Sequence, residues 1–88
     1  MKDLVLKCFF SNAVEGGKLR VEELNLEKYI EYIDFKVNII NNIINIYDND
    51  NKVIVKKYDI KKTKILYESN IGDELIIEYK GQVTKFYI

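Results

Sequence analysis

Lysines and tyrosines gather in the middle of the chain, and their side chains are suited to binding a polyanion. Lysine ammonium groups contact phosphate oxygens, while tyrosine rings stack on nucleic-acid bases. A surface that combines the two residue types therefore predicts a contact with nucleic acid. The candidate binding surface consists of Lys52, Lys56, Lys57, Tyr58, Lys61, Lys62, Lys64 and Tyr67.

The positive charge of the chain is concentrated in the same segment. Residues 1–34 carry a net charge of −2, residues 35–64 carry +4 and residues 65–88 carry −2. The whole chain is neutral, with 14 positive and 14 negative side chains, which argues against a long-range field that attracts polyanions. Lysines on strands also prevent edge-to-edge aggregation. Edge protection is therefore the alternative explanation of the lysine cluster.

The side chains that most enzymes use are largely missing. The sequence has no histidine, the commonest general base and metal ligand near neutral pH. Its four glycines form no phosphate-binding G-x-G-x-x-G or G-x-x-x-x-G-K motif. Neighbouring acids such as Glu22 and Glu23 are expected to be solvated, because a catalytic carboxylate needs burial to shift its pKa. We expect no enzymatic activity, no cofactor and no metal site.

One acidic segment resembles the opening of a calcium-binding loop. Residues Asp48 to Asn51 place oxygen ligands at alternate positions. The pattern then fails, because Lys52 stands at a ligand position and Val53 replaces the required glycine. Asp and Asn also favour turns, so a hairpin turn is the favoured interpretation.

Length and composition predict one small domain spanning residues 1–88. A hydrophobic share of 48% excludes a disordered chain. No apolar run approaches the roughly 20 residues that cross a bilayer, and the N-terminus lacks the features of an export signal. The single cysteine, Cys8, cannot form an internal disulfide. We therefore expect a cytoplasmic protein without a membrane contact.

The elements of the N-terminal third follow from alternation and spacing. Asp3 to Phe10 is predicted to be a strand, and Lys18 to Glu22 a second strand after a loop at Gly16-Gly17. Asn25 is expected to cap a short helix over residues 26–32, followed by a strand over residues 33–40. A continuous strand from Tyr29 is the alternative. The first strand would bury Leu4, Leu6, Cys8 and Phe10, and the helix would bury Leu26, Tyr29, Ile30 and Ile33.

The remaining chain reads as strands joined by tight turns. Asn41-Asn42 is predicted to form a two-residue hairpin turn, because asparagine tolerates the left-handed conformation. Lys80-Gly81 is predicted to join the last hairpin. Strands are expected over residues 43–47, 52–58, 63–68, 74–79 and 82–88.

These elements predict a mainly β fold, or β-rich α+β if the helix forms. We expect an antiparallel meander of about 6–8 short strands, curled into a barrel or roll that protects its edges. The strand succession from Phe35 to Ile88 resembles that of bacterial pleckstrin-homology-like domains, in which an extended segment such as Tyr58–Ile60 precedes a terminal hairpin. The C-terminal helix of those domains has no counterpart after Ile88.

The sequence predicts a small non-catalytic binding or regulatory protein whose partner is another protein. Its AT-rich residue usage is typical of a low-GC bacterium or its phage. This suggests a phage- or mobile-element-encoded inhibitor of a host system, for example an anti-CRISPR-like protein. Nucleic-acid binding through residues 52–64 is the first alternative. A small-ligand-binding β-barrel, with Tyr29 or Tyr32 at its mouth, is the second. A free strand edge would also allow homo-oligomers.

Overall fold

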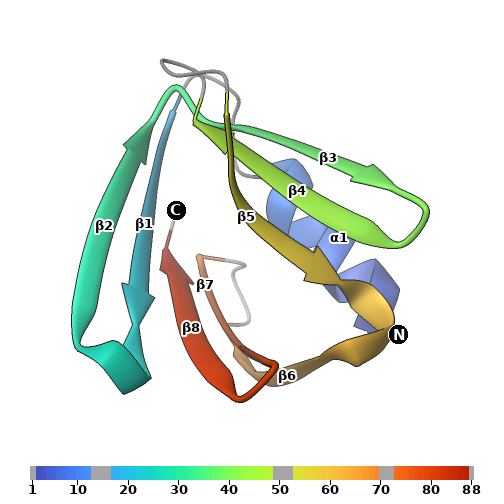
Figure 1. Ribbon diagram of the computed structural model, residues 1–88. Coiled ribbons are helices and arrows are strands. Elements are labelled where there is room, and N and C mark those ends of the chain that lie inside the picture. The colour runs from blue at the N-terminus through green and yellow to red at the C-terminus, as the bar shows by residue number, and fades with distance from the viewer. Residues whose placement is uncertain (1, 13–16, 49–52, 70–72, 88) are drawn as a thin grey trace.

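The computed structural model describes residues 2–12, 17–48, 53–69 and 73–87, which form one α-helix and two antiparallel sheets (Figure 1). Helix α1 spans Lys2–Asn12, and two 3₁₀ turns span Leu24–Leu26 (η1) and Ile60–Lys62 (η2). The strands are β1 (Lys18–Glu23), β2 (Lys28–Ile33), β3 (Lys36–Ile40), β4 (Ile43–Asp48), β5 (Val53–Asp59), β6 (Thr63–Glu68), β7 (Glu74–Tyr79) and β8 (Gln82–Tyr87).

The mainly β, antiparallel fold predicted from the sequence is confirmed. One sheet has the strand order β2-β1-β8-β7-β6 and the other has the order β3-β4-β5. The chain leaves the five-stranded sheet between β2 and β3 and returns to it through η2, before β6. The two sheets do not close into a barrel. Pairing of β8 with β1 also departs from a simple meander, because it joins strands far apart in sequence.

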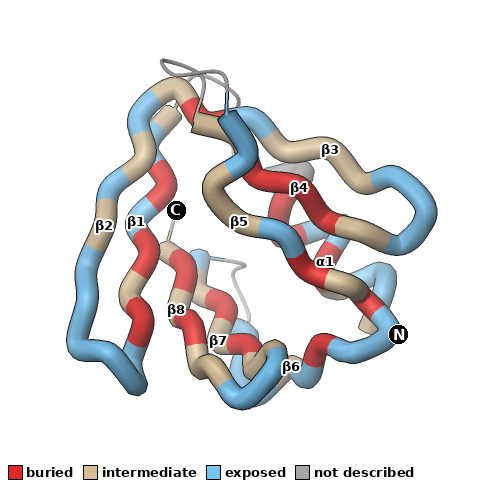
Figure 2. The backbone as a smooth tube through the Cα atoms, viewed as in Figure 1, coloured by how far each residue is buried: buried red, intermediate tan, exposed pale blue. Residues whose placement is uncertain are grey.

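The core lies between the two sheets and α1. Figure 2 shows buried positions alternating along β1 and β8 and running together along β4. Phe86 on β8 lies at the centre, with ring centroids 5.4 Å from Phe10, 6.3 Å from Phe9 and 5.9 Å from Tyr58. These aromatic contacts join the helix, the edge of the three-stranded sheet and the middle of the five-stranded sheet.

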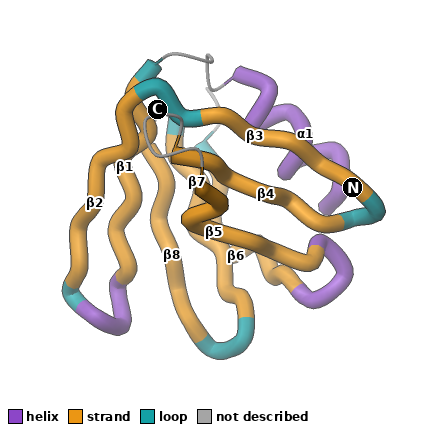
Figure 3. The backbone as a smooth tube through the Cα atoms, turned by 45° about the horizontal axis from the view of Figure 1, so that its top comes forward, coloured by secondary structure: helices purple, strands orange, loops and turns teal. Residues whose placement is uncertain are grey.

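The prediction of a strand over residues 3–10 is wrong, because this segment forms α1. Leu6, Phe9 and Phe10 are buried, at the i, i+3, i+4 spacing of one helical face. Leu4 is 56% exposed and Cys8 is exposed, so the predicted buried face of Leu4, Leu6, Cys8 and Phe10 does not exist. A short apolar segment satisfies both periodicities. The buried side chains of this segment join the core cluster, and this packing favours the helical periodicity. Figure 3 shows the segment as a helix.

The predicted helix over residues 26–32 is also wrong, since η1 and strand β2 occupy this segment. Asn25 caps no helix: its Nδ2 donates to the Gly81 carbonyl at 3.0 Å, and its Oδ1 accepts from the Val83 N–H at 2.6 Å. These bonds fix η1 against the β7–β8 turn. The expected buried stripe does not form. Leu26 is 63% exposed, Tyr29 is 53% exposed and Ile33 is 55% exposed, while Ile30 is half-buried.

The strand predicted over residues 33–40 is interrupted. Asp34 has a φ of 57°, and its N–H donates to the Gly17 carbonyl at 2.9 Å. This left-handed residue separates β2 from β3 and lets Phe35 enter the core, where it is 1% exposed. The alternative of one continuous strand from Tyr29 fails at the same residue, although β2 does begin near it.

Both predicted two-residue turns are confirmed. Asn41 and Asn42 have φ angles of 52° and 65°, as a twisted hairpin turn requires. Lys80 and Gly81 have φ angles of 51° and 80°. The predicted strands in the second half are confirmed within a residue or so at each end. The turn predicted at Asp48 to Asn51 lies outside the described residues, except for Asp48 at the end of β4.

Candidate binding surfaces

The structure distributes the predicted lysine–tyrosine surface over three places. Lys56, Lys57 and Tyr58 lie on β5, Lys61 and Lys62 on η2, and Lys64 and Tyr67 on β6. Lys52 lies outside the described residues. Lys57, Lys61, Lys62, Lys64 and Tyr67 are exposed, Lys56 is half-buried and Tyr58 is buried. The predicted residues thus belong to three consecutive elements, and Tyr58 is not exposed on any of them.

Lys56 and Lys57 point to opposite faces of β5, because successive side chains alternate along a strand. The Lys56 ammonium forms an ion pair with the Glu23 carboxylate, which connects β5 to β1 across the two sheets. The side chains of Lys56 and Glu23 are only 12% and 7% exposed. The charge of Lys56 is thus neutralised within the fold, whereas Lys57 faces solvent.

The environment of Glu23 keeps its carboxylate ionised. The hydrogen bond from Lys56 lowers the pKa of Glu23, against the opposing effect of burial. The charge of Lys28, which pairs with Glu23 in the sheet register, and a hydrogen bond from Gln82 also lower this pKa. The expectation that Glu23 is solvated is therefore wrong: it is a buried structural anion within a cluster of donors.

Tyr58 belongs to the core and offers no free ring face. It is 6% exposed, and its ring packs edge-on against Tyr79 at 5.4 Å. Burial raises the pKa of the Tyr58 hydroxyl well above its ordinary value, with a smaller opposing effect from a hydrogen bond with Thr84. Tyr58 therefore remains neutral at physiological pH.

A small open pocket lies along the edge of β5, opposite the β7–β8 turn. It has a volume of about 260 Å³. Because β5 is the last strand of its sheet, one side of it has no strand neighbour, and side chains from both of its faces reach this edge. The pocket is lined by Val55, Lys56, Lys57, Tyr58, Tyr79, Lys80 and Gln82.

The second candidate surface is the face of the five-stranded sheet that points away from the core. We call it the outer sheet face. Its residues alternate with the buried residues of each strand and share one side through the strand registers. Over β2, β1, the last residues of β8 and the first residues of β7, the outer sheet face comprises Lys18, Arg20, Glu22, Tyr29, Glu31, Ile33, Glu74, Ile76, Lys85 and Tyr87.

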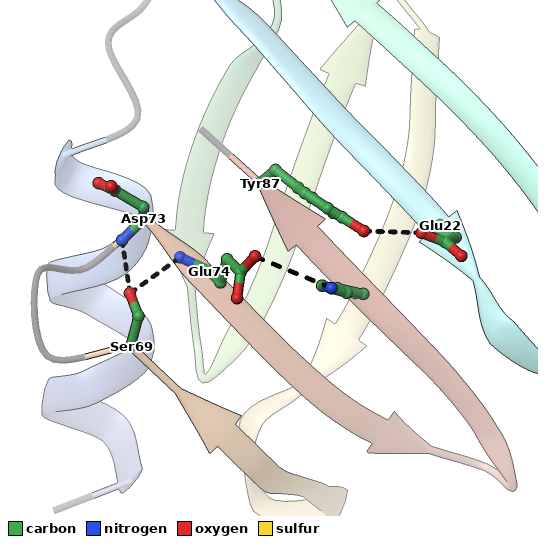
Figure 4. A network of polar contacts seen from close by, with 6 residues as sticks. Glu22, Ser69, Asp73, Glu74 and Tyr87 are labelled. Atoms are coloured by element: carbon green, nitrogen blue, oxygen red, sulfur yellow. Dashed lines mark hydrogen bonds and ion pairs between the residues drawn. The ribbon is translucent and has the colours of Figure 1, made fainter.

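Tyr87 is the best-held side chain of the outer sheet face. Its hydroxyl donates to Glu22 Oε1 at 2.7 Å, and Glu74 forms an ion pair of 3.8 Å with Lys85 (Figure 4). The Lys85 ammonium lies 4.5 Å from the centre of the Tyr87 ring, and the Arg20 guanidinium lies 5.9 Å from it. The Tyr87 ring is thus fixed by two cations and one acid.

The neighbouring end of β7 is fixed in a similar way. Ser69 Oγ accepts hydrogen bonds from the backbone N–H groups of Asp73 (2.9 Å) and Glu74 (3.2 Å) (Figure 4). The N–H of Ser69 in turn donates to the Glu74 carbonyl at 3.1 Å. These bonds hold the start of β7, and with it the Glu74 carboxylate, in position.

A second polar network lies on β2. The Tyr29 hydroxyl donates to Glu31 Oε1 at 2.9 Å, and Lys18 pairs with the same carboxylate at 3.4 Å. The bond from Tyr29 lowers the pKa of Glu31, while desolvation and the carboxylate raise the pKa of Tyr29. Tyr29 and Ile33 nevertheless remain 53% and 55% exposed. Apolar surface is therefore available beside groups whose polar atoms are already paired.

The three-stranded sheet carries a smaller polar feature. Asn45 Nδ2 donates to Asn38 Oδ1 at 3.0 Å, and Asn38 Nδ2 donates to the Tyr47 hydroxyl at 3.3 Å. Asn45 is 7% exposed, and among the described residues its Oδ1 is the one buried side-chain polar atom without a hydrogen-bond donor.

Neither a metal centre nor a membrane-spanning helix is found in the described part of the chain. Residues 2–12, 17–48, 53–69 and 73–87 contain no group of three or more acidic or cysteine side chains placed to hold a metal ion. Their helices are also too short and too polar to cross a bilayer.

Sequence reasoning missed the partners that the tertiary structure supplies. Lys80 and Gln82 join Lys57 at the pocket although they are more than 20 residues away in sequence. Lys80 was recognisable as a turn residue, but its spacing gives no sign that the turn faces β5. The alternation of apolar and polar residues along β1 and β8 could have indicated which residues form the outer sheet face. It could not have indicated that β1 pairs with β8.

Comparison with known proteins gives no relative: no family model, no curated protein and no solved structure matches this chain.

Proposed function

We propose that the chain is a non-catalytic binding protein that acts through a protein–protein contact made by the outer sheet face. The observation that carries this proposal is the Tyr87 ring, which Arg20 and Lys85 both approach, on the same sheet face as the exposed Tyr29 and Ile33. Tyrosine and arginine are enriched among the residues that dominate binding energy at protein interfaces.

The rigidity of this face favours binding. Its side chains are already held by hydrogen bonds and ion pairs, so a partner orders fewer rotamers on contact. The hydrogen bonds also satisfy the carboxylates of Glu22 and Glu31 before any partner arrives. Docking then requires little loss of side-chain entropy and leaves few acids unpaired.

The mixture of charges suits a selective contact. Lys18, Arg20 and Lys85 alternate with acids on the same face, so only a partner with a complementary arrangement avoids like-charge contacts. A protein of this kind acts by occupying its partner's surface, as an inhibitor or regulator does. Inhibition of a host system by a phage- or mobile-element-encoded protein is the specific form that we propose from the residue usage.

A matched pair of isoleucine variants tests the surface. Ile33 on the outer sheet face and Ile40 on the three-stranded sheet are 55% and 56% exposed. We expect the immobilised chain to retain one stoichiometric protein from a bacterial lysate. Ile33→Ala or Tyr29→Ala should weaken this retention by about 2 kcal/mol, as at an interface hot spot, whereas Ile40→Ala should leave it unchanged. Equal retention by all three variants, or loss with Ile40→Ala alone, would contradict the proposal.

A further inference from the structure

We propose that the pocket between β5 and the β7–β8 turn binds the phosphate group of a small ester of about one nucleotide in size. The nucleotide is either free or part of a nucleic-acid strand. This site is distinct from the outer sheet face, because its lining comes from β5 and from the turn end of the β7–β8 hairpin. Its function would be separate from the protein contact proposed above.

The charge of the pocket favours an anion. Three lysines and no acid line it. The charge of Lys56 is matched by Glu23 behind it. Lys57 and Lys80 have no carboxylate within ion-pair distance among the described residues. Two uncompensated cations, one on β5 and one in the β7–β8 turn, therefore line one small space. A phosphate group is the anion that lysine ammonium groups commonly bind.

The uncharged walls keep this positive potential intact. Tyr58 stays neutral, since burial raises the pKa of its hydroxyl, and it adds no negative charge at physiological pH. Gln82 contributes an amide group, and Val55 contributes a half-buried apolar side chain.

The backbone elements that line the pocket are held by the fold. The Lys80 ammonium lies 5.4 Å from the centre of the Tyr79 ring, and the Tyr79 ring contacts Tyr58 on β5. The Lys56–Glu23 ion pair fixes β5 at the neighbouring residue. The pocket is thus formed before a ligand arrives.

The size of the pocket limits the ligand. Its volume of about 260 Å³ is below the range of roughly 300–1,000 Å³ that is typical of drug-sized ligands. A phosphate group with one attached sugar or base fits this volume. One nucleotide unit of a strand could occupy the same space while the rest of the strand remains outside.

Two lysine variants and one matched control test the site. Lys57→Gln removes one cation. Lys80→Asn removes the other and suits the left-handed backbone at this turn better than lysine does, so it should not unfold the hairpin. Lys62→Gln makes the same change of charge at an exposed lysine of η2, outside the pocket. The probes are inorganic phosphate, adenosine 5′-monophosphate and a single-stranded oligonucleotide.

Binding is measured by NMR titration of the backbone amides, with the salt concentration held constant. We expect saturable shifts at Lys57, Lys80 and Gln82, and a loss of affinity of about tenfold for each of the two pocket variants, as expected for a charge-assisted hydrogen bond. Lys62→Gln should bind as the unmodified chain does. Binding of phosphate and the monophosphate assigns the site to a free ester. Oligonucleotide binding that the monophosphate displaces, with the same dependence on Lys57 and Lys80, assigns it to nucleic acid.

Two results would overturn the proposal. One is the absence of saturable shifts with all three probes. The other is binding that Lys62→Gln weakens and the two pocket variants do not, because the lysines of η2 would then carry the contact.

Discussion

Lys56 on β5 and Glu23 on β1 form an ion pair that joins the two sheets, and their side chains are only 12% and 7% exposed. In a domain with a thin core, a paired charge at this depth has two consequences. The pair fixes the edge strand that lines the pocket, and removal of either partner leaves the other charge buried. Several properties of the protein are expected to depend on it.

Removal of one partner should destabilise the fold strongly. We expect Lys56→Met to lower the free energy of unfolding by about 3 kcal/mol, because Glu23 would remain as a buried charge without its main partner. The double variant Lys56→Met with Glu23→Gln should recover most of this loss. Urea denaturation measures both values. As a control, Lys18→Met removes a pair whose lysine is 53% exposed and should cost less than about 1 kcal/mol. Equal costs for Lys56→Met and Lys18→Met would contradict the buried pair.

The same pair predicts the response to acid. Lys56 holds the pKa of Glu23 below its ordinary value of 4.5, so the carboxylate binds its proton more weakly in the folded chain than in the unfolded chain. The stability it contributes is complete above the unfolded pKa and is lost as pH falls through the folded pKa. Thermal unfolding from about pH 6 to about pH 3 should show a steeper fall in Tm for the unmodified chain than for Glu23→Gln. Parallel curves for the two proteins would refute this linkage.

Two leucines distinguish the helix from the strand at the N-terminus. A strand would place Leu4 and Leu6 on the same face, whereas α1 leaves Leu4 56% exposed and Leu6 0% exposed. We expect Leu6→Ala to cost about 2–5 kcal/mol, through lost burial and the cavity left behind, and Leu4→Ala to cost less than about 0.5 kcal/mol. Chemical denaturation of the two variants provides the measurement. Similar losses at both positions would favour the strand.

The thiol of Cys8 gives an independent test of the same helix. Cys8 is exposed on α1, so a maleimide should label it in the folded protein at nearly the rate found in denaturant. Mass spectrometry over time follows the reaction. A thiol that reacts only after denaturation would show that Cys8 is buried, as the alternating pattern predicted.

The hairpin turn at Asn41-Asn42 should respond to residue shape. Asn42 has a φ of 65°, a conformation that glycine adopts freely and a β-branched residue resists. We expect Asn42→Gly to change the free energy of unfolding by no more than about 0.5 kcal/mol in either direction, and Asn42→Val to lower it by about 1–3 kcal/mol. Thermal denaturation can measure the difference. A valine variant as stable as the glycine variant would exclude the left-handed turn.

The sequence by itself determined the parts of this protein that depend on short-range physics. Asn41-Asn42 and Lys80-Gly81 form the predicted turns, because left-handed backbone is a local property of those residues. The strands from β4 to β8 follow from alternation of β-branched and aromatic residues between such turns. The mainly β, antiparallel class follows from the number of these hairpins.

Only the tertiary structure decided the N-terminal elements and the partners of individual side chains. Residues 3–10 satisfy two periodicities, and the contacts of Phe10 with Phe86 favour the helix. Asn25 could cap a helix, yet its bonds to the β7–β8 turn are made with residues more than 50 positions away. Lys56 and Lys57 are adjacent in sequence, but one pairs with Glu23 while the other meets Lys80 at a pocket. Spacing along a chain specifies which face a side chain occupies within an element, whereas the packing of distant elements specifies what that face meets.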